Sequence, residues 1–105
     1  MNADSLGLIP QDISVLVAIL NRHIPRKEVW AFGSRVQGNA RPFSDLDLAI
    51  IEDEPLSADI KAELRYVLSE SNLPVKVDIV EWSRLTPSFQ KIIQEKHIIL
   101  IPKAA

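Results

Sequence analysis

A chain of 105 residues, 47% of them hydrophobic, with 14 acidic and 12 basic residues and a formal net charge of −2, predicts one small domain over residues 1–105. The absence of cysteine excludes disulfide bonds and thiolate zinc sites. The charge balance argues against direct nucleic-acid binding. Without a basic leader or an apolar run of membrane-spanning length, we expect a cytoplasmic protein with no membrane partner.

The first half of the chain predicts one helix and two strands. Apolar residues recur at helical spacing over residues 13–24, and Pro25 ends this helix. Residues 28–32 form a short β-rich run, followed by a loop or a single helical turn over residues 34 to about 40. Residues 45–51 form the second strand. About a dozen residues join the two strands, so either relative direction is open.

The second half predicts two helices, each followed by a strand. An amphipathic helix covers residues 58–71 and a strand residues 75–82. A helix begins at Thr86–Pro87 and ends near residue 96, and residues 97–101 supply a last strand. The order αββαβαβ predicts an α/β (α+β) fold with a small mixed β-sheet flanked by helices.

Two carboxylates begin the second predicted strand. Asp45 and Asp47 are one residue apart, so they project from the same face at about 6.5–7 Å along the strand. Like charges this close cost free energy unless a cation lies between them. Magnesium is bound by one or two carboxylates together with substrate phosphates. The pair therefore predicts a divalent metal site.

A third carboxylate, Asp78, lies among β-branched residues in the third predicted strand. If this strand lies beside the second, Asp78 completes a cluster of three carboxylates. Such a cluster can hold two metal ions about 3.5–4 Å apart for in-line displacement at phosphorus.

The Gly33–Ser34 turn at the end of the first strand is suited to binding phosphate. Gly33 can adopt a positive φ and lets a phosphate approach the backbone closely. Ser34 offers a hydroxyl with the amides that follow it, and Arg35 adds a positive charge nearby. The Walker A pattern is absent. With the carboxylates, this turn predicts metal-dependent phosphoryl or nucleotidyl transfer.

Each of these features has a plainer interpretation when it is taken alone. A Gly-Ser pair is usually an ordinary turn, an Asp-x-Asp at a strand edge is usually solvated, and a single strand acid is often half-exposed. Their joint occurrence at this spacing, each against an apolar strand, favours a site.

The pattern Gly33-Ser34-x10-Asp45-x-Asp47, with Asp78 on a later strand, resembles the nucleotidyltransferase superfamily of the DNA polymerase β type. In so short a chain it resembles the minimal nucleotidyltransferases (MNT), the antitoxins paired with HEPN-domain toxins. The similarity covers nearly the whole chain, from the first helix to the last strand. It implies the polymerase β catalytic-core fold.

The resemblance also implies roles for the residues that match the motif. Gly33 and Ser34 would contact the triphosphate of ATP, with Arg35 as a further nucleotide-binding residue. The pair Asp45–Asp47 would bridge Mg²⁺ and phosphates, in a site that suits two metal ions. Asp78 would bind the metal at the attacking hydroxyl and accept its proton. One difference is Gln37, where relatives often carry a second basic residue; it bears on triphosphate binding and leaves the metal site unaffected.

The activity that the resemblance implies is transfer of AMP from ATP to a tyrosine hydroxyl of a HEPN ribonuclease toxin encoded nearby, which silences the toxin. Two alternatives stay open: an antitoxin that neutralises by binding alone, and an adenylyltransferase for a small molecule. The second alternative needs an acceptor pocket, for which the last 25 or so residues are too few. Nucleobase preference, acceptor identity and homo- or hetero-oligomeric state are not determined by the sequence.

Overall fold

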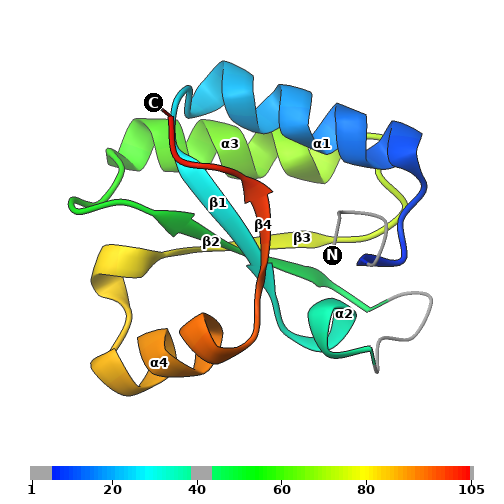
Figure 1. Ribbon diagram of the computed structural model, residues 1–105. Coiled ribbons are helices and arrows are strands. Elements are labelled where there is room, and N and C mark those ends of the chain that lie inside the picture. Colours follow the sequence, from blue (N-terminus) through cyan, green and yellow to red (C-terminus); the bar gives the residue numbers. More distant parts are fainter. Residues whose placement is uncertain (1–5, 39–43, 105) are drawn as a thin grey trace.

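The computed structural model describes residues 6–38 and 44–104 (Figure 1). Within these ranges it contains the elements α1 (Pro10–His23), β1 (Glu28–Phe32), α2 (Ser34–Gln37), β2 (Leu46–Ile51), α3 (Ala58–Glu70), β3 (Val77–Glu81), the 3₁₀ turn η2 (Trp82–Arg84), α4 (Pro87–Glu95) and β4 (Ile98–Ile101). None of the helices in the described part of the chain is long and apolar enough to cross a membrane.

The four strands form one mixed sheet in the order β3-β2-β1-β4. Strand β1 pairs antiparallel with both β2 and β4, whereas β3 runs parallel to β2. Helices α1 and α3 lie side by side over one face of the sheet, and α2 and α4 lie on the opposite side (Figure 1). The predicted α/β fold with a small mixed sheet flanked by helices is therefore confirmed.

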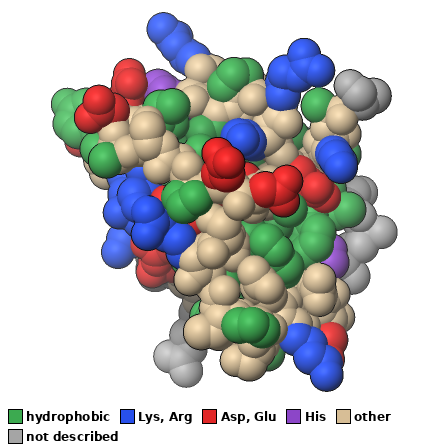
Figure 2. Space-filling model, turned by 90° about the vertical axis from the view of Figure 1, so that its left-hand side faces the viewer, with side chains coloured by type: hydrophobic (Ala, Val, Ile, Leu, Met, Phe, Trp, Pro, Cys, Tyr) green, Lys and Arg blue, Asp and Glu red, His purple; other side chains and the backbone are tan. Residues whose placement is uncertain are grey.

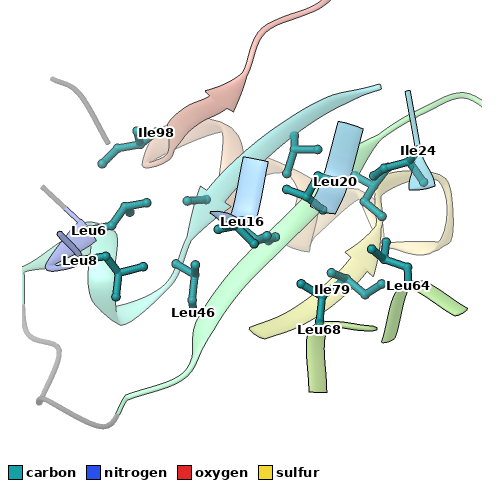
Figure 3. Packing of buried hydrophobic residues seen from close by; sticks show 14 of the residues in the cluster. Leu6, Leu8, Leu16, Leu20, Ile24, Leu46, Leu64, Leu68, Ile79 and Ile98 are labelled. Carbon is teal, nitrogen blue, oxygen red and sulfur yellow. The ribbon is translucent and has the colours of Figure 1, made fainter. Parts of the chain in front are cut away.

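The core lies between the sheet and the α1/α3 layer. Every second residue of β2 faces this layer, so that Leu46, Leu48 and Ile50 are fully buried. They pack against apolar side chains from both helices, shown in Figure 3: Leu16, Leu20, Leu64 and Leu68. Burying each such side chain contributes about 1.5–3 kcal/mol. The alternation fixes which face of β2 points away from the core.

Short polar side chains set the starts of the two later helices. The Oγ of Ser57 accepts a hydrogen bond from the Ile60 amide (3.2 Å), and the Oγ1 of Thr86 accepts one from the Phe89 amide (3.3 Å). These bonds satisfy amides that have no partner within the first helical turn. Proline in the first turn of α4 removes one further unpaired amide, as the sequence predicted.

The third strand is shorter than predicted, and a 3₁₀ turn that the sequence analysis did not predict follows it. Strand β3 covers Val77–Glu81, and Trp82 already belongs to η2. The amide and hydroxyl of Ser83 donate to the Glu52 carboxylate at 3.0 and 3.2 Å, which draws the chain out of the strand. Of the turn predicted over residues 34–40, the last two residues lie outside the described ranges.

Glu81 is a buried carboxylate at the end of β3 that is paired with two cations. Its side chain is 3% exposed, and its oxygens lie 3.0 Å from Lys61 Nζ of α3 and 3.0 Å from Arg84 Nε. Burial opposes its ionisation, but the hydrogen bonds and charges of Lys61 and Arg84 outweigh burial and lower the pKa of Glu81. Figure 2 views the end of the molecule where β2 ends and α3 begins, with acidic and basic side chains close together.

We expect Glu81→Gln to lower the free energy of unfolding at pH 7 by about 1–3 kcal/mol, because an amide cannot balance the two neighbouring cations. Since folding lowers the pKa of Glu81, its contribution is fully present above the unfolded-state pKa. That contribution is lost as the pH falls through the lower folded-state pKa. Urea unfolding at a series of pH values should therefore show variant and wild type converging in acid. The exposed Glu63→Gln is the control, and a difference that does not shrink in acid would contradict this account.

Candidate active site

Asp47 and Asp78 lie side by side on the face of the sheet that points away from α1 and α3. They are direct partners in the parallel register of β2 and β3, in which paired residues project to the same side. Asp45 precedes β2 by one residue and is exposed. The expectation that the third strand lies beside the second is confirmed. The structure thus brings the three predicted carboxylates to one end of this strand pair.

The carboxylates repel one another in the protein as it stands. Partial burial raises the pKa of Asp47, and the negative charges of Asp78 and Asp45 raise it further. The charged form of Asp47 is therefore disfavoured by folding. A divalent cation bound at this position would reverse that effect.

The carboxylates at this site suit a magnesium ion whose remaining ligands come from substrate phosphates and water. In the described part of the chain, no group of three or more His, Cys, Asp or Glu side chains is placed so that it could hold a metal ion, so Asp45, Asp47 and Asp78 do not form a ready three-carboxylate metal cluster. A closed cage is not what magnesium requires, because it is usually bound by one or two carboxylates with water and substrate phosphates in the other positions. Asp47 and Asp78, which are direct partners in the register and interact through their charges, provide two carboxylates of this kind.

The Gly33–Ser34 turn lies directly against Asp47. Gly33 has φ 82° and ψ −157°, a backbone conformation that residues other than glycine strongly disfavour. A Cβ atom at Gly33 would collide with Oδ2 of Asp47. The Gly33 carbonyl accepts hydrogen bonds from the amides of Val36 (3.1 Å) and Gln37 (3.0 Å), which close the short α2 turn. The backbone of the turn can therefore lie this close to the Asp47 carboxylate only because residue 33 is glycine.

Arg35, which the sequence analysis gave as a positive charge beside the turn, is buried. Its Nε donates to the carbonyl oxygen of Ser44 and its Nη1 to that of Leu6, each at 3.0 Å. Because Ser44 immediately precedes Asp45, Arg35 fixes the chain at the entry to β2. Nucleotide binding by Arg35 stays a prediction, and these contacts give it a structural role as well.

The surroundings of Asp78 are open. Lys76 Nζ lies 3.6 Å from its Oδ1, with the two side chains 72% and 44% exposed, so this ion pair contributes little to stability. A cavity of about 520 Å³ opens along β3, with Lys76 and Asp78 in its lining and the end of α3 on its other side. Asp78 is thus accessible to a group that arrives from the β3 edge of the sheet.

One residue near the turn could not be inferred from sequence. Lys96, which follows α4, lines a small hollow together with Gly33 and Gln37. It is separated from the turn by most of the chain and belongs to no motif, so no local pattern marks it. Only the packing of α4 against the sheet brings it close.

The sequence profile described as "Nucleotidyltransferase domain" matches residues 13–100, which include the Gly33–Ser34 turn and all three aspartates. The chain belongs to this nucleotidyltransferase family. It is 39% identical over 98 residues to the "Probable protein adenylyltransferase MntA" of Haemophilus influenzae, covering 93% of this chain and 86% of that protein. The resemblance to the minimal nucleotidyltransferases is confirmed.

Solved structures have the same fold as this nucleotidyltransferase. One assigned to the minimal nucleotidyltransferases has a TM-score of 0.67 and 30% identity, covering 93% of this chain and 95% of that chain. A toxin–antitoxin complex with AMP-PNP gives a TM-score of 0.72 at 24% identity, covering 87% and 73%. An MNT antitoxin complexed with the tri-AMPylated HEPN toxin of Shewanella oneidensis gives 0.66 at 21% identity, covering 89% and 71%. The last two likenesses concern the fold alone.

Replacing Gly33 by alanine tests the close approach of turn and carboxylate. We expect Gly33→Ala to cost about 1–3 kcal/mol of stability and to weaken Mg²⁺-nucleotide binding, because Asp47 must move. Gly38→Ala is a matched control: Gly38 also has φ 82°, but a Cβ there meets nothing within 4 Å. It should cost about 1–2 kcal/mol and leave binding unchanged. Equal loss of nucleotide binding in both variants would contradict the prediction.

Replacing Asp47 by asparagine tests the electrostatic conflict. Without divalent metal we expect Asp47→Asn to raise the free energy of unfolding by about 0.5 kcal/mol or more, since it removes a charge that folding disfavours. Adding Mg²⁺ and ATP should then stabilise the wild type and not the variant. Thermal unfolding in EDTA and in Mg²⁺-ATP measures both effects, with the exposed Asp53→Asn as control. A variant less stable than wild type in EDTA would show that Asp47 is not under repulsion.

Proposed function

We propose that this nucleotidyltransferase acts in the cytoplasm as a magnesium-dependent protein adenylyltransferase. It would transfer AMP from ATP to a tyrosine hydroxyl of a HEPN-domain toxin encoded nearby and act as the antitoxin of that toxin. The observation that carries the proposal is the pairing of Asp47 with Asp78 beside the Gly33 turn. The 39% identity to a protein named as an adenylyltransferase supports the chemistry. The AMPylated toxin in a complex of the same fold supports the partner class.

Each residue at the site has a distinct part in the proposal. The oxygens of Asp45 and Asp47 would hold Mg²⁺ with the phosphates of ATP, and Asp78 would hold the metal nearest the acceptor. Bound Mg²⁺ would neutralise phosphate charge and lower the pKa of the acceptor hydroxyl. The Gly33 backbone would lie against the triphosphate, because no Cβ intervenes, and the Ser34 hydroxyl would donate to a phosphate oxygen.

The reaction is an in-line displacement at the α-phosphorus. The tyrosine oxygen forms a bond to that phosphorus, while the bond to the oxygen that bridges toward the β-phosphate breaks and pyrophosphate leaves. Asp78 accepts the phenolic proton. The site contributes mainly orientation and charge stabilisation, as expected for phosphoryl-type transfer.

A protein acceptor fits the accessibility of Asp78. The carboxylate is 44% exposed and lies on β3, an edge strand of the sheet. A phenol on a partner surface could therefore reach Asp78 without rearrangement of the sheet.

Intact mass spectrometry of the adjacently encoded HEPN protein tests this proposal. After incubation with the chain, ATP and Mg²⁺, we expect an AMP-sized mass increase on that protein. Asp47→Asn and Asp78→Asn should each reduce its rate by about 100-fold or more, since each removes a ligand charge at the reacting phosphate. Fragmentation of the modified protein should locate AMP on a tyrosine.

Two results would count against the proposal. A stable complex without any mass increase would favour neutralisation by binding alone, particularly if Asp47→Asn still neutralises the toxin. Rapid pyrophosphate release by the chain without its partner would indicate a different acceptor. The exposed Asp53→Asn serves as the control and should transfer AMP at the wild-type rate.

A further inference from the structure

The proposed reaction needs positive charge near the terminal phosphates of ATP, and the residues of the turn supply little of it. The guanidinium of Arg35 is buried and donates to the carbonyl oxygens of Ser44 and Leu6. Gln37, at the end of α2, is exposed and uncharged. A positive charge at the terminal phosphates would therefore have to come from another helix, strand or loop.

A hollow of about 190 Å³ lies between the Gly33–Ser34 turn and α4. Gly33 and Gln37 line it from the side of the turn, and Lys96 lines it from the end of α4. The other lining residues are apolar, namely Phe32, Phe89, Ile92 and Ile93. Among the described residues that line the hollow, Lys96 alone is charged. An anion that extends from Asp47 past Gly33 would meet this side chain.

The backbone at Lys96 is held in place by its neighbours. Its amide donates to the Ile93 carbonyl at 3.2 Å, and the Nδ1 of His97 lies 2.9 Å from the same oxygen. The His97 ring stacks on Trp30 of β1, with centroids 3.9 Å apart. The end of α4 and Lys96, which follows it, are therefore held against the sheet.

The side chain of Lys96 is available. It is exposed, and none of the ion pairs formed between described residues includes it. No acidic side chain among the described residues lines the hollow, so none would compete with a phosphate for the ammonium group of Lys96. A lysine in this position has no described partner in the protein that would compete with a ligand.

We infer that Lys96 binds the terminal phosphates of the nucleotide and supplies the positive charge that Gln37 lacks. This inference rests on the proposed function, because it requires a nucleoside triphosphate at the carboxylates. Lys96 contacts phosphates that leave with pyrophosphate, so its contribution is to ATP binding and not to recognition of AMP.

Calorimetric titration of the full chain with ATP and with AMP, each with Mg²⁺, tests the inference. We expect Lys96→Gln to weaken ATP binding about three- to tenfold, the range for a partly solvated charge pair with phosphate, and to leave AMP binding unchanged. Lys96→Arg should retain most of the affinity. Adding Gln37→Arg to Lys96→Gln should restore ATP binding, because position 37 lines the same hollow.

Lys91→Gln is the matched control, since Lys91 is exposed on α4 and does not line the hollow. Equal ATP affinity in Lys91→Gln and Lys96→Gln would overturn the inference. A parallel loss of ATP and AMP binding in Lys96→Gln would also overturn it, because that pattern indicates general damage to the site. Failure of the wild-type chain to bind either nucleotide would instead overturn the proposed function.

Discussion

The parallel pairing of β2 with β3 is the constraint on which the site depends. It puts Asp47 beside Asp78 on one face, while the alternate residues of β2 are fully buried against α1 and α3 on the other. A shift of one residue in either strand would turn a carboxylate into the core. Core packing thus fixes the register, and the register fixes the distance between the carboxylates.

Two acidic side chains of neighbouring strands, Glu81 and Asp47, have opposite electrostatic surroundings. Glu81 on the core face has Lys61 and Arg84 at 3.0 Å, and its pKa is lowered. Asp47 on the opposite face has neighbouring acids, and its pKa is raised. The charge of Glu81 is balanced by neighbouring cations of the protein, whereas the charges that shift the pKa of Asp47 include no such balance. A raised carboxylate pKa beside a glycine turn is typical of a functional site.

The face that bears the site also receives α2 and α4, which shape its surroundings. Gly33 allows the backbone to touch Asp47, and Arg35 fixes the chain just before Asp45 through Ser44. Stacking of His97 on Trp30 holds the end of α4 beside the same turn. Chain segments distant in sequence therefore meet around the carboxylates, so the environment of the carboxylates is set by tertiary packing.

The sequence by itself determined the order of the main helices and strands, the apolar face of β2 and the pattern of Gly33, Ser34 and the aspartates, because spacing within one strand or turn fixes which side chains share a face. It did not determine the end of β3 or the turn η2. It left the direction of β2 against β1 open, and it did not find the Glu81 cluster, the burial of Arg35 or Lys96 near the turn. Those depend on which strands pair and where α4 packs. Such contacts join residues far apart in the chain, and local periodicity carries no information about them.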